Sequence, residues 1–410
     1  MTEFDIAGYL RPGDLVVIGQ AVAEPPGLVR QLIAAAESVE GLTAFCGYTL
    51  SPAWKEIGPA GPRVLAYAAH GALRSLAAKG MLDVLPWHLS AVEPNIVSGR
   101  LPVDVVLLQV GPKDDQGFYN LGATVDYAGI AAERARVVLV EVNPNMPRTR
   151  SDRRLPAALV TAEISSSEEL AGSPARPANA VERGVAHQVA SVIPSGATVQ
   201  LGASALADEV ARELHSRRGL RVRSGLVGDW LVDLYAAGAM APGPDTSVIG
   251  MALGTRRLYD FVGDSDLVRF APTQDLVDPV AMRACDPYVA VNSAIEVDLS
   301  GAINSEVVAG RYVGAVGGQV DFFRATRQSA SGLAIVALAA THPSGESRIV
   351  PALSGPVTSL KSDIDLVITE WGIADLRAAS LAERAARLIA VAAPEHRAAL
   401  ASGPLAFANR

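Results

Sequence analysis

Residues of several kinds are scarce in this sequence of 410 residues, and each shortage excludes a class of protein. Two cysteines, Cys46 and Cys285, are too few for a disulfide framework and permit a reducing compartment. The net charge is −8 with no basic stripe, which argues against a nucleic-acid partner. The N-terminal residues lack the pattern of a signal peptide, and no apolar run reaches the roughly 20 residues that span a bilayer. We therefore expect a cytoplasmic protein with no nucleic-acid or membrane partner.

Metal ligands are also scarce. The six histidines are scattered, and they and the two cysteines form no spacing of the H-E-x-x-H or C-x-x-C kind. We therefore expect no metal cofactor. What the chain has in quantity is apolar residues, at 50% of the sequence, which is enough for the cores of two or three domains.

These apolar residues are arranged as buried strands that alternate with amphipathic helices. Val103–Val110 and Ala135–Val142 are long apolar runs, typical of parallel strands covered on both faces. Similar strands recur in the second half, at 198–201, 221–223, 289–292, 334–338 and 366–369. Between Asn143 and Glu182 the composition changes to proline, arginine and serine, which indicates a boundary near residue 180. The sequence predicts two open α/β domains with mainly parallel sheets, 1–180 and 181–410.

The stretch from Ile193 to Gly238 carries the strongest local signal. A short apolar strand ends at Leu201, a turn of small residues follows at Gly202–Ser204, and an amphipathic helix comes next. A strand, a small-residue turn and a helix N-terminus together can seat a phosphate or another anion. Ordinary βαβ units use such turns as well, so this pattern alone leaves both readings open.

Motifs along nearly the whole chain resemble those of the acetyl-CoA hydrolase/transferase family, which includes acetate and 4-hydroxybutyrate CoA-transferases. In the first half these are Ala23–Pro26, Val110–Phe118 and Glu141–Asn145. In the second half they are Gly196–Gly238, Asn292–Gly301, Val316–Phe322, Ser347–Pro351 and Asp365–Leu376.

The resemblance implies a class I CoA-transferase-like fold, with the active site in the cleft between the domains. It implies that coenzyme A or an acyl-CoA is the substrate and that the second domain binds it. The residues expected to contact CoA by resemblance are Gly202, Ser204, Asn292, Val316 and Glu370. It also implies a homodimer or a higher homo-oligomer.

One position departs from the family in a way that bears directly on the chemistry. In the family, a glutamate attacks the acyl-CoA carbonyl and then carries CoA as a thioester, and that glutamate falls on Gly225 here. Asp229, the nearest carboxylate in the segment, matches a different family residue. The family's V-G-G-Q turn, which supplies N–H groups to the oxyanion, is matched by Gly317, Gly318 and Gln319. Two adjacent glycines can also be a plain tight turn, but within this string we favour the oxyanion loop.

Other residues were weighed as replacements for the nucleophile or as acid–base groups. Glu24 lies near the acyl site by resemblance, and it can equally complement a helix N-terminus. His88 is the best acid–base candidate, although a lone histidine is more often structural. Cys46 ends a strand where ligands bind, yet a small buried hydrophobic residue is the more common role. Trp230 can be a lid over an enlarged acyl pocket or a core residue.

Three functions remain open from the sequence. The first is an acyl-CoA enzyme of this family, with ordinary CoA transfer weak or absent because the glutamate is missing. The second is the same fold used for another thioester reaction, such as hydrolysis, decarboxylation or acyl transfer to an acceptor other than CoA. The third is a non-catalytic CoA-binding subunit, against which the retained Gly317–Gly318 turn argues.

Overall fold

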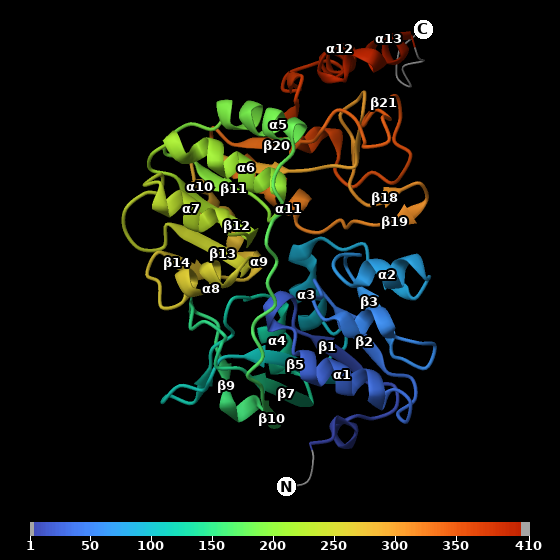
Figure 1. Ribbon diagram of the computed structural model, residues 1–410, viewed down its shortest axis with the longest axis vertical. Helices are drawn as coiled ribbons and strands as arrows, with labels where there is room; N and C mark the ends of the chain where they lie inside the picture. Colours follow the sequence, from blue (N-terminus) through green and yellow to red (C-terminus); the bar gives the residue numbers. More distant parts are fainter. Residues whose placement is uncertain (1–3, 403–410) are drawn as a thin grey trace. The chain divides into compact units, whose positions relative to one another are not determined.

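The computed structural model describes residues 4–402, which form two compact units (Figure 1). Unit 1 comprises residues 4–173 and 248–273, and unit 2 comprises 174–247 and 274–402. The chain thus leaves unit 1 after Ser173 and returns to it for one excursion of strand, helix and strand. Within residues 4–402, no helix is both long and apolar enough to cross a bilayer.

Unit 1 is built on a parallel sheet in the order β10-β7-β5-β1-β2-β3-β4. Its strands are β1 (Leu15–Ile18), β2 (Thr43–Cys46), β3 (Arg63–Ala66), β4 (Leu82–Val84), β5 (Val105–Val110), β7 (Val137–Val142) and β10 (Ala162–Ser165). The order reverses between β1 and β5, since the chain runs outward from β1 on one side and then returns to the other. Smaller strands are β6 (Phe118–Tyr119), β8 (Arg150–Ser151), β9 (Leu155–Pro156), β13 (Ser247–Ala252) and β14 (Val268–Phe270).

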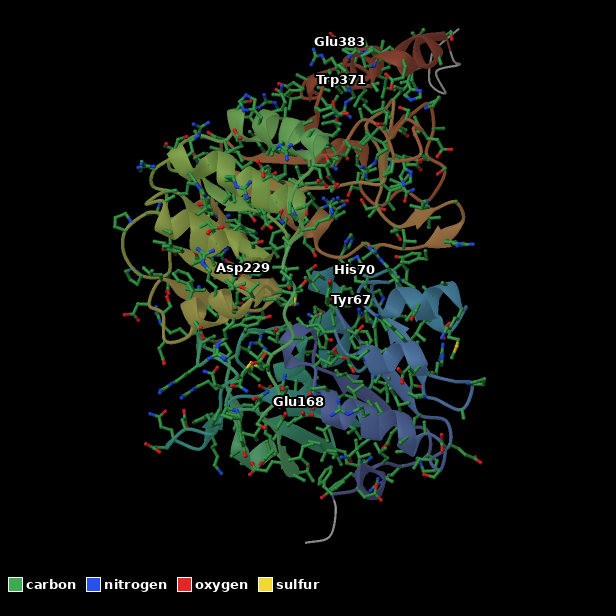
Figure 2. The ribbon with its side chains drawn as sticks, viewed as in Figure 1. Tyr67, His70, Glu168, Asp229, Trp371 and Glu383 are labelled. Atoms are coloured by element: carbon green, nitrogen blue, oxygen red, sulfur yellow. The ribbon has the colours of Figure 1, made fainter. Side chains whose placement is uncertain are left out.

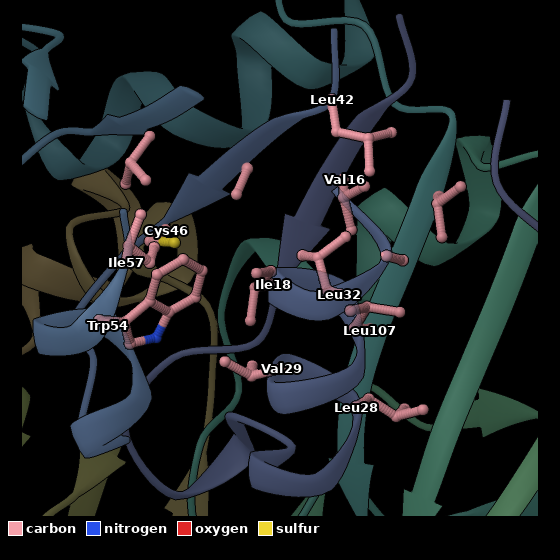
Figure 3. Packing of buried hydrophobic residues seen from close by; sticks show 14 of the residues in the cluster. Val16, Ile18, Leu28, Val29, Leu32, Leu42, Cys46, Trp54, Ile57 and Leu107 are labelled. Carbon is pink, nitrogen blue, oxygen red and sulfur yellow. The ribbon is translucent and has the colours of Figure 1, made fainter. Parts of the chain in front are cut away.

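Helices cover this sheet and close its core. They are η1 (Ile6–Tyr9), η2 (Ala21–Ala23), α1 (Pro26–Ala35), η3 (Pro52–Glu56), α2 (Leu73–Ala78), η4 (Leu89–Ala91), α3 (Val92–Val97), α4 (Tyr127–Arg134), η5 (Ala157–Leu159) and α8 (Arg256–Val262). Helix α1 presents Leu28 and Leu32 to Val16 and Ile18 of β1, in a cluster that Figure 3 shows from close by. Trp54 closes the same cluster from η3 and is fully buried.

Unit 2 repeats the architecture with the strand order β23-β22-β20-β15-β11-β12. The strands are β11 (Thr198–Gln200), β12 (Arg221–Val227), β15 (Tyr288–Asn292), β20 (Leu333–Ala337), β22 (Leu366–Thr369) and β23 (Gly372–Asp375). All neighbours pair in parallel except β23, which is antiparallel to β22. The order reverses at β11, because β12 lies on one side of it and β15, much later in the chain, on the other.

The helices and small strands of unit 2 surround this sheet. They are α5 (Ala180–Ser191), α6 (Ala205–Glu213), η6 (Leu214–Ser216), α7 (Trp230–Ala236), α9 (Thr273–Leu276), α10 (Pro279–Arg283), α11 (Gln319–Ala325), η7 (Thr326–Gln328), η8 (Lys361–Asp363), α12 (Leu381–Val391) and α13 (Pro394–Ser402), with β16 (Glu296–Asp298), β17 (Ile303–Asn304), β18 (Val307–Val308), β19 (Arg311–Tyr312) and β21 (Ile349–Val350).

The predicted fold class is confirmed: the structure is α/β with mainly parallel sheets. The predicted strand at 221–223 continues to Val227, so Gly225 lies inside a strand rather than in the loop after it. The stretch assigned to an excursion up to Glu182 already contains the start of α5. That helix begins with a capping box between Asn179 and Glu182.

Candidate active site

Strand order places the ligand-binding edge of unit 2 at the carboxyl ends of β11 and β15. In open α/β sheets, ligands bind where the strand order reverses, outside the carboxyl ends of the strands. The last residues of these two strands face one another here, since the amide of Asn292 donates to Gln200 Oε1 over 2.8 Å. Asn292, expected from the resemblance to contact CoA, therefore lies at the switch point and is held by a partner on the neighbouring strand.

The turn after β11 borders a small cavity at this same edge. The cavity has a volume of about 90 Å³, and its lining includes Gly202, Ser204, Asn292 and Ser293. Ser204 caps helix α6, since its side chain accepts a hydrogen bond from the Ala207 N–H. A Cβ on Gly202 would meet no atom within 4 Å, so this turn is open rather than packed. The structure thus brings Gly202, Ser204 and Asn292 together, as expected for a shared ligand.

Gly225 lies on β12, the strand that pairs with β11, near the turn that begins at Gly202. The hydroxyl of Ser224 donates to the carbonyl of Leu201 over 2.7 Å, which ties β12 to the residue before Gly202. Gly225 follows directly and is buried. The residue to which the resemblance assigns the family's nucleophile is thus a buried glycine next to a serine that is bonded to the residue before Gly202.

The candidate oxyanion loop precedes helix α11. Gly317 has a φ of +55°, a conformation that favours glycine, and Gly318 is the N-cap residue of the helix. N–H groups at the start of a helix have no acceptor within that helix, so they can serve another group. A Cβ at Gly317 would lie no closer than 3.6 Å to its nearest neighbour. The glycine is therefore explained by backbone conformation and not by crowding.

Gln319 fixes this loop to the switch point. Its amide nitrogen donates to the Ser293 carbonyl over 2.7 Å, directly after β15. Its oxygen accepts from the hydroxyls of Ser305, at 3.2 Å, and Ser359, at 2.8 Å. One side chain thus connects the loop to three other segments of unit 2. These bonds hold the segment that carries the Gly317–Gly318 backbone.

Two residues expected to contact CoA have other bonds. Val316 is half-buried and directly precedes Gly317, and its backbone lies close enough to the Tyr312 hydroxyl to lower the pKa of that group against the effect of burial. Glu370 follows β22, which is separated from β15 by β20, and its carboxylate accepts the N–H of Ala340 over 2.9 Å. Glu370 therefore joins the ends of β20 and β22 and does not lie beside Asn292 in the sheet.

In unit 1, Glu24 is a buried carboxyl that anchors a loop. Only 3% of its surface is exposed, and it accepts hydrogen bonds from Leu50 N at 2.5 Å, Ser51 N at 2.9 Å and Trp54 Nε1 at 2.5 Å. Burial raises the pKa of Glu24 to about 7, against these hydrogen bonds, which lower it. This set of contacts gives Glu24 a structural role that the sequence did not reveal.

His88 lies near the far edge of the same sheet. It is the N-cap residue of η4, a few residues after the edge strand β4, and it is half-buried. Its Nδ1 is buried without a hydrogen-bond partner among the described residues. His88 and Glu24 follow different strands, β4 and β1, which are separated by β2 and β3.

A buried polar network at the carboxyl end of β1 was not predicted. Gln20 donates to Asp126 and accepts from the hydroxyl of Tyr67 over 2.5 Å. Burial raises the pKa of Asp126 to about 6 and lowers that of His70 to about 4. Figure 2 shows Tyr67 and His70 close together after β3. Gln20, Tyr67 and Asp126 are far apart in sequence, and the only local signal was that Gln20 follows a buried strand.

A second unpredicted feature is a group of acidic side chains beyond Gly225. Burial, together with the charges of Asp229 and Asp233, raises the pKa of Asp208 to about 6. An oxygen of Asp208 lies 3.6 Å from the point where a Cβ on Gly228 would be. Its carboxyl thus has a pKa in the range useful for proton transfer near neutral pH.

The remaining alternatives from the sequence are resolved by burial. Trp230 is 1% exposed and donates its Nε1–H to the Gly202 carbonyl over 2.9 Å, so it is a core residue and not a lid. Cys46 belongs to the core of unit 1, and burial raises the pKa of its thiol. Cys285 is half-buried, and burial raises its pKa as well. In the described part of the chain, no three His, Cys, Asp or Glu side chains gather as a metal site.

Comparison with known proteins finds relatives over nearly the whole chain. Family models match the acetyl-CoA hydrolase/transferase N-terminal domain over residues 1–169 and the C-terminal domain over residues 254–403, and Gly225 lies between the two ranges. The chain is 33% identical to a 4-hydroxybutyrate coenzyme A transferase of Clostridium kluyveri, over 94% of this chain and 92% of that one.

Two solved structures are similar over nearly the whole chain. RipA of Yersinia pestis has a TM-score of 0.90 at 27% identity, covering 97% of this chain and 95% of its own. A 4-hydroxybutyrate CoA-transferase of Porphyromonas gingivalis has a TM-score of 0.79 at 28% identity, covering 97% and 94%.

Proposed function

Since the chain belongs to the acetyl-CoA hydrolase/transferase family, we propose that it acts on an acyl-CoA thioester by a reaction that does not pass through an enzyme-bound glutamyl-CoA. The observation that carries this proposal is Gly225. Gly225 lies on β12, and the resemblance assigns the family's nucleophile to this residue. The neighbouring Ser224 is bonded to the residue before the Gly202 turn. Transfer of CoA through the enzyme requires a carboxylate there, and a glycine cannot supply one.

The retained loop supports a reaction at the thioester carbonyl. The N–H groups of Gly317 and Gly318 can stabilise the negative charge that develops on the carbonyl oxygen during attack. Gln319 holds them in place through its bonds to Ser293, Ser305 and Ser359. A chain that only bound CoA would gain nothing from donors aimed at a developing charge. This favours an enzyme over a non-catalytic binding subunit.

Hydrolysis is the simplest such reaction. Water adds to the carbonyl carbon, the carbon–sulfur bond breaks, and the thiolate of CoA takes up a proton as the acid is released. A glycine at residue 225 places no side chain in the way of the water or of another small acceptor. Decarboxylation and acyl transfer to an acceptor other than CoA are alternatives that use the same carbonyl donors. We also propose a homo-oligomer, most simply a dimer, located in the cytoplasm, by analogy with the family.

A thioester cleavage assay tests this proposal. Purified protein is incubated with a panel of acyl-CoAs while the loss of each ester and the appearance of free CoA are followed by mass spectrometry. We expect turnover of at least one ester. In the Gly317→Ala variant the rate should fall by about tenfold or more, because alanine disfavours the left-handed backbone conformation on which the loop depends. Gly310→Ala is the matched control, since Gly310 has a φ of +75° and open space around it, in the same unit. Turnover of no ester, or equal rates in both variants, would contradict the proposal.

A further inference from the structure

Glu306 is a buried carboxylate of unit 2, in the turn between β17 and β18. Only 5% of its surface is exposed. One carboxylate oxygen accepts the hydroxyl proton of Thr358 over 2.7 Å, and the other accepts that of Tyr312 over 2.9 Å. Burying a charged group is costly unless hydrogen bonds compensate for the lost water. Each oxygen of Glu306 thus has one hydroxyl donor that offsets this cost.

The surroundings of the two hydroxyls direct both protons to Glu306. The oxygen of Thr358 accepts the N–H of Ser305 over 2.9 Å, and its single proton is donated to Glu306. Burial and the charge of Glu306 raise the pKa of Tyr312, so the phenol keeps the proton that it donates. Both oxygens of Glu306 therefore act as acceptors, which a carboxylate can provide and an amide cannot.

The backbone of Glu306 supports the segment that leads into the loop at Gly317. Its carbonyl accepts the N–H of Val313 over 2.8 Å and the N–H of Gly314 over 3.0 Å. A Cβ on Gly314 would lie only 1.9 Å from the Ser305 carbonyl oxygen, so the two segments are in direct contact. Gly317 follows Gly314 by three residues. The position of Glu306 therefore determines where the loop begins.

The side chain of Glu306 is connected to the start of the same loop through Tyr312. Tyr312 ends β19, and its hydroxyl donates to Glu306. The backbone of Val316 lies close enough to this hydroxyl to lower the pKa of Tyr312 against the effect of burial. Val316 directly precedes Gly317. The phenol that Glu306 holds therefore adjoins the residue at which the loop starts.

Through Thr358, the carboxylate of Glu306 is connected to the end of the loop. Thr358 accepts the N–H of Ser305 and is followed directly by Ser359. The hydroxyls of Ser305 and Ser359 both donate to the side-chain oxygen of Gln319, which comes directly after the two glycines. One carboxylate is thus connected to the residues on both sides of the glycine turn.

We propose that Glu306 is a positioning residue for the thioester reaction. Its carboxylate holds the N–H groups of Gly317 and Gly318 in place, through Tyr312 before the loop and Thr358 after it, and does not itself contact the substrate. This inference rests on the proposed function, because it concerns the donors that this reaction uses. Donors that serve a developing charge act in the transition state, so displacing them slows the chemical step more than it weakens substrate binding.

Steady-state cleavage of an acyl-CoA by the full chain tests this role in Glu306→Gln, which keeps the size of the side chain but offers one acceptor oxygen. We expect kcat to fall by about tenfold or more, while KM changes by less than about threefold. Hydrogen exchange of residues 313–318 should become faster in the same variant, because the side chain no longer holds both hydroxyls.

Tyr312→Phe distinguishes positioning from a general loss of stability. It removes the hydroxyl that needs the second acceptor, so in this background Glu306→Gln should lower kcat by less than about threefold further. A further fall of about tenfold would mean that Glu306 acts independently of Tyr312, and it would overturn the inference. Tyr312→Phe alone should lower kcat and make exchange of residues 313–318 faster, which keeps the test decisive if Glu306→Gln does not fold.

Glu209→Gln is the matched control, because Glu209 is also 5% exposed in unit 2 but lies on α6 and pairs with Arg212. It should leave kcat and the exchange of residues 313–318 unchanged. If the unaltered chain cleaves no acyl-CoA, the proposed function is wrong, and hydrogen exchange still tests without substrate whether Glu306 holds the loop. Equal exchange of residues 313–318 in Glu306→Gln and Glu209→Gln, or equal kcat in a chain that cleaves, would overturn the inference.

Discussion

The carboxyl ends of the two central strands, β1 in unit 1 and β11 in unit 2, differ in the kind of residue that they carry. After β1, buried carboxyl and amide side chains hold the loops together, with Glu24 bonded to three donors and Gln20 bonded to Asp126. At the corresponding edge of unit 2, the turn after β11 carries the small residues Gly202 and Ser204, beside the bonded amides of Gln200 and Asn292. Buried side chains with hydrogen-bond partners thus hold the loops after β1, whereas small residues form the turn after β11.

This difference bears on the missing nucleophile. A carboxylate that already accepts three hydrogen bonds and is 3% exposed, as Glu24 is, is not free to attack a thioester without breaking its own loop. In unit 2, the residue to which the resemblance assigns the family's glutamate is Gly225, which has no carboxylate. We therefore expect a reaction other than CoA transfer through an enzyme-bound glutamyl-CoA.

The largest effect on stability is expected for Glu24→Ala, which removes the buried carboxyl that follows β1 and anchors a loop. It would leave two backbone N–H groups and the Trp54 indole N–H buried without an acceptor. We expect the free energy of unfolding to fall by about 3–5 kcal/mol, measured by urea denaturation. Glu37→Ala, at an exposed position on the same unit, should change it by less than about 0.5 kcal/mol. A small effect of Glu24→Ala would free this carboxyl for a catalytic role.

The pH dependence of stability is a second test of the buried state of Glu24. Burial raises the pKa of Glu24 from 4.5 to about 7, so between these values the folded chain keeps a proton that the unfolded chain has released. Stability therefore falls as the pH rises, by about 2 kcal/mol from this group between pH 5 and pH 7. Asp126, with its pKa raised to about 6, acts in the same direction, whereas His70, with its pKa lowered to about 4, opposes it.

A comparison of Glu24→Gln with the unaltered chain isolates this group. Urea denaturation at pH 5 and pH 7 should show a shallower loss of stability in Glu24→Gln, because the amide does not titrate while Asp126 and His70 are unchanged. Equal losses of stability in the two proteins would mean that folding does not keep a proton on Glu24 in this pH range.

On the other edge, Gln319→Ala should loosen the loop before α11. It removes a donor to the Ser293 carbonyl and an acceptor for two serine hydroxyls, at an expected cost of about 1–2 kcal/mol. Hydrogen exchange of Gly314–Gly318 should become faster, and thioester cleavage should fall because the donors are no longer held. Unchanged exchange in that segment would show that Gln319 does not position it.

The smallest expected effect is that of Ser224→Ala. It removes the hydroxyl that joins β12 to the Leu201 carbonyl, beside Gly225, and we expect a loss of about 1 kcal/mol. Ser331→Ala, at an exposed turn of the same unit, serves as the control and should be neutral by chemical denaturation. Equal stabilities of the two variants would show that this cross-strand bond contributes nothing.

The sequence predicted those parts of the fold that local apolar patterns determine. Runs such as Val105–Val110 and Val137–Val142 are buried on both faces, so they are unbroken in the sequence and easy to recognise. The two-residue strand β8 carries an arginine and has no such pattern, and only its pairing with β14 makes it a strand. Helix α5 was missed although Asn179 and Glu182 have the spacing of a capping box.

For the site, the sequence predicted residues that lie in family motifs. It did not predict contacts that form only when distant segments pack together. The resemblance assigned Gly202, Ser204 and Asn292 to CoA binding, which stays a prediction, and the structure places the three in the lining of one cavity. The bonds of Gln20 to Asp126 and Tyr67 join segments 47 to 106 residues apart, which no local pattern reveals. The pairing of Arg150 with Arg269 spans a similar separation and was missed for the same reason.

The most direct test of the account is exchange of labelled acetate into acyl-CoA by the unaltered chain and by Gly225→Glu, with Gly225→Ala as the control for added volume. CoA esters are followed by mass spectrometry, and the melting temperature of each variant shows that it is folded. The account predicts no exchange by the unaltered chain or by Gly225→Ala, and label in the CoA ester with Gly225→Glu, because the carboxylate restores the nucleophile. Rapid exchange by the unaltered chain would contradict the account, since another carboxylate would then have to serve as the nucleophile.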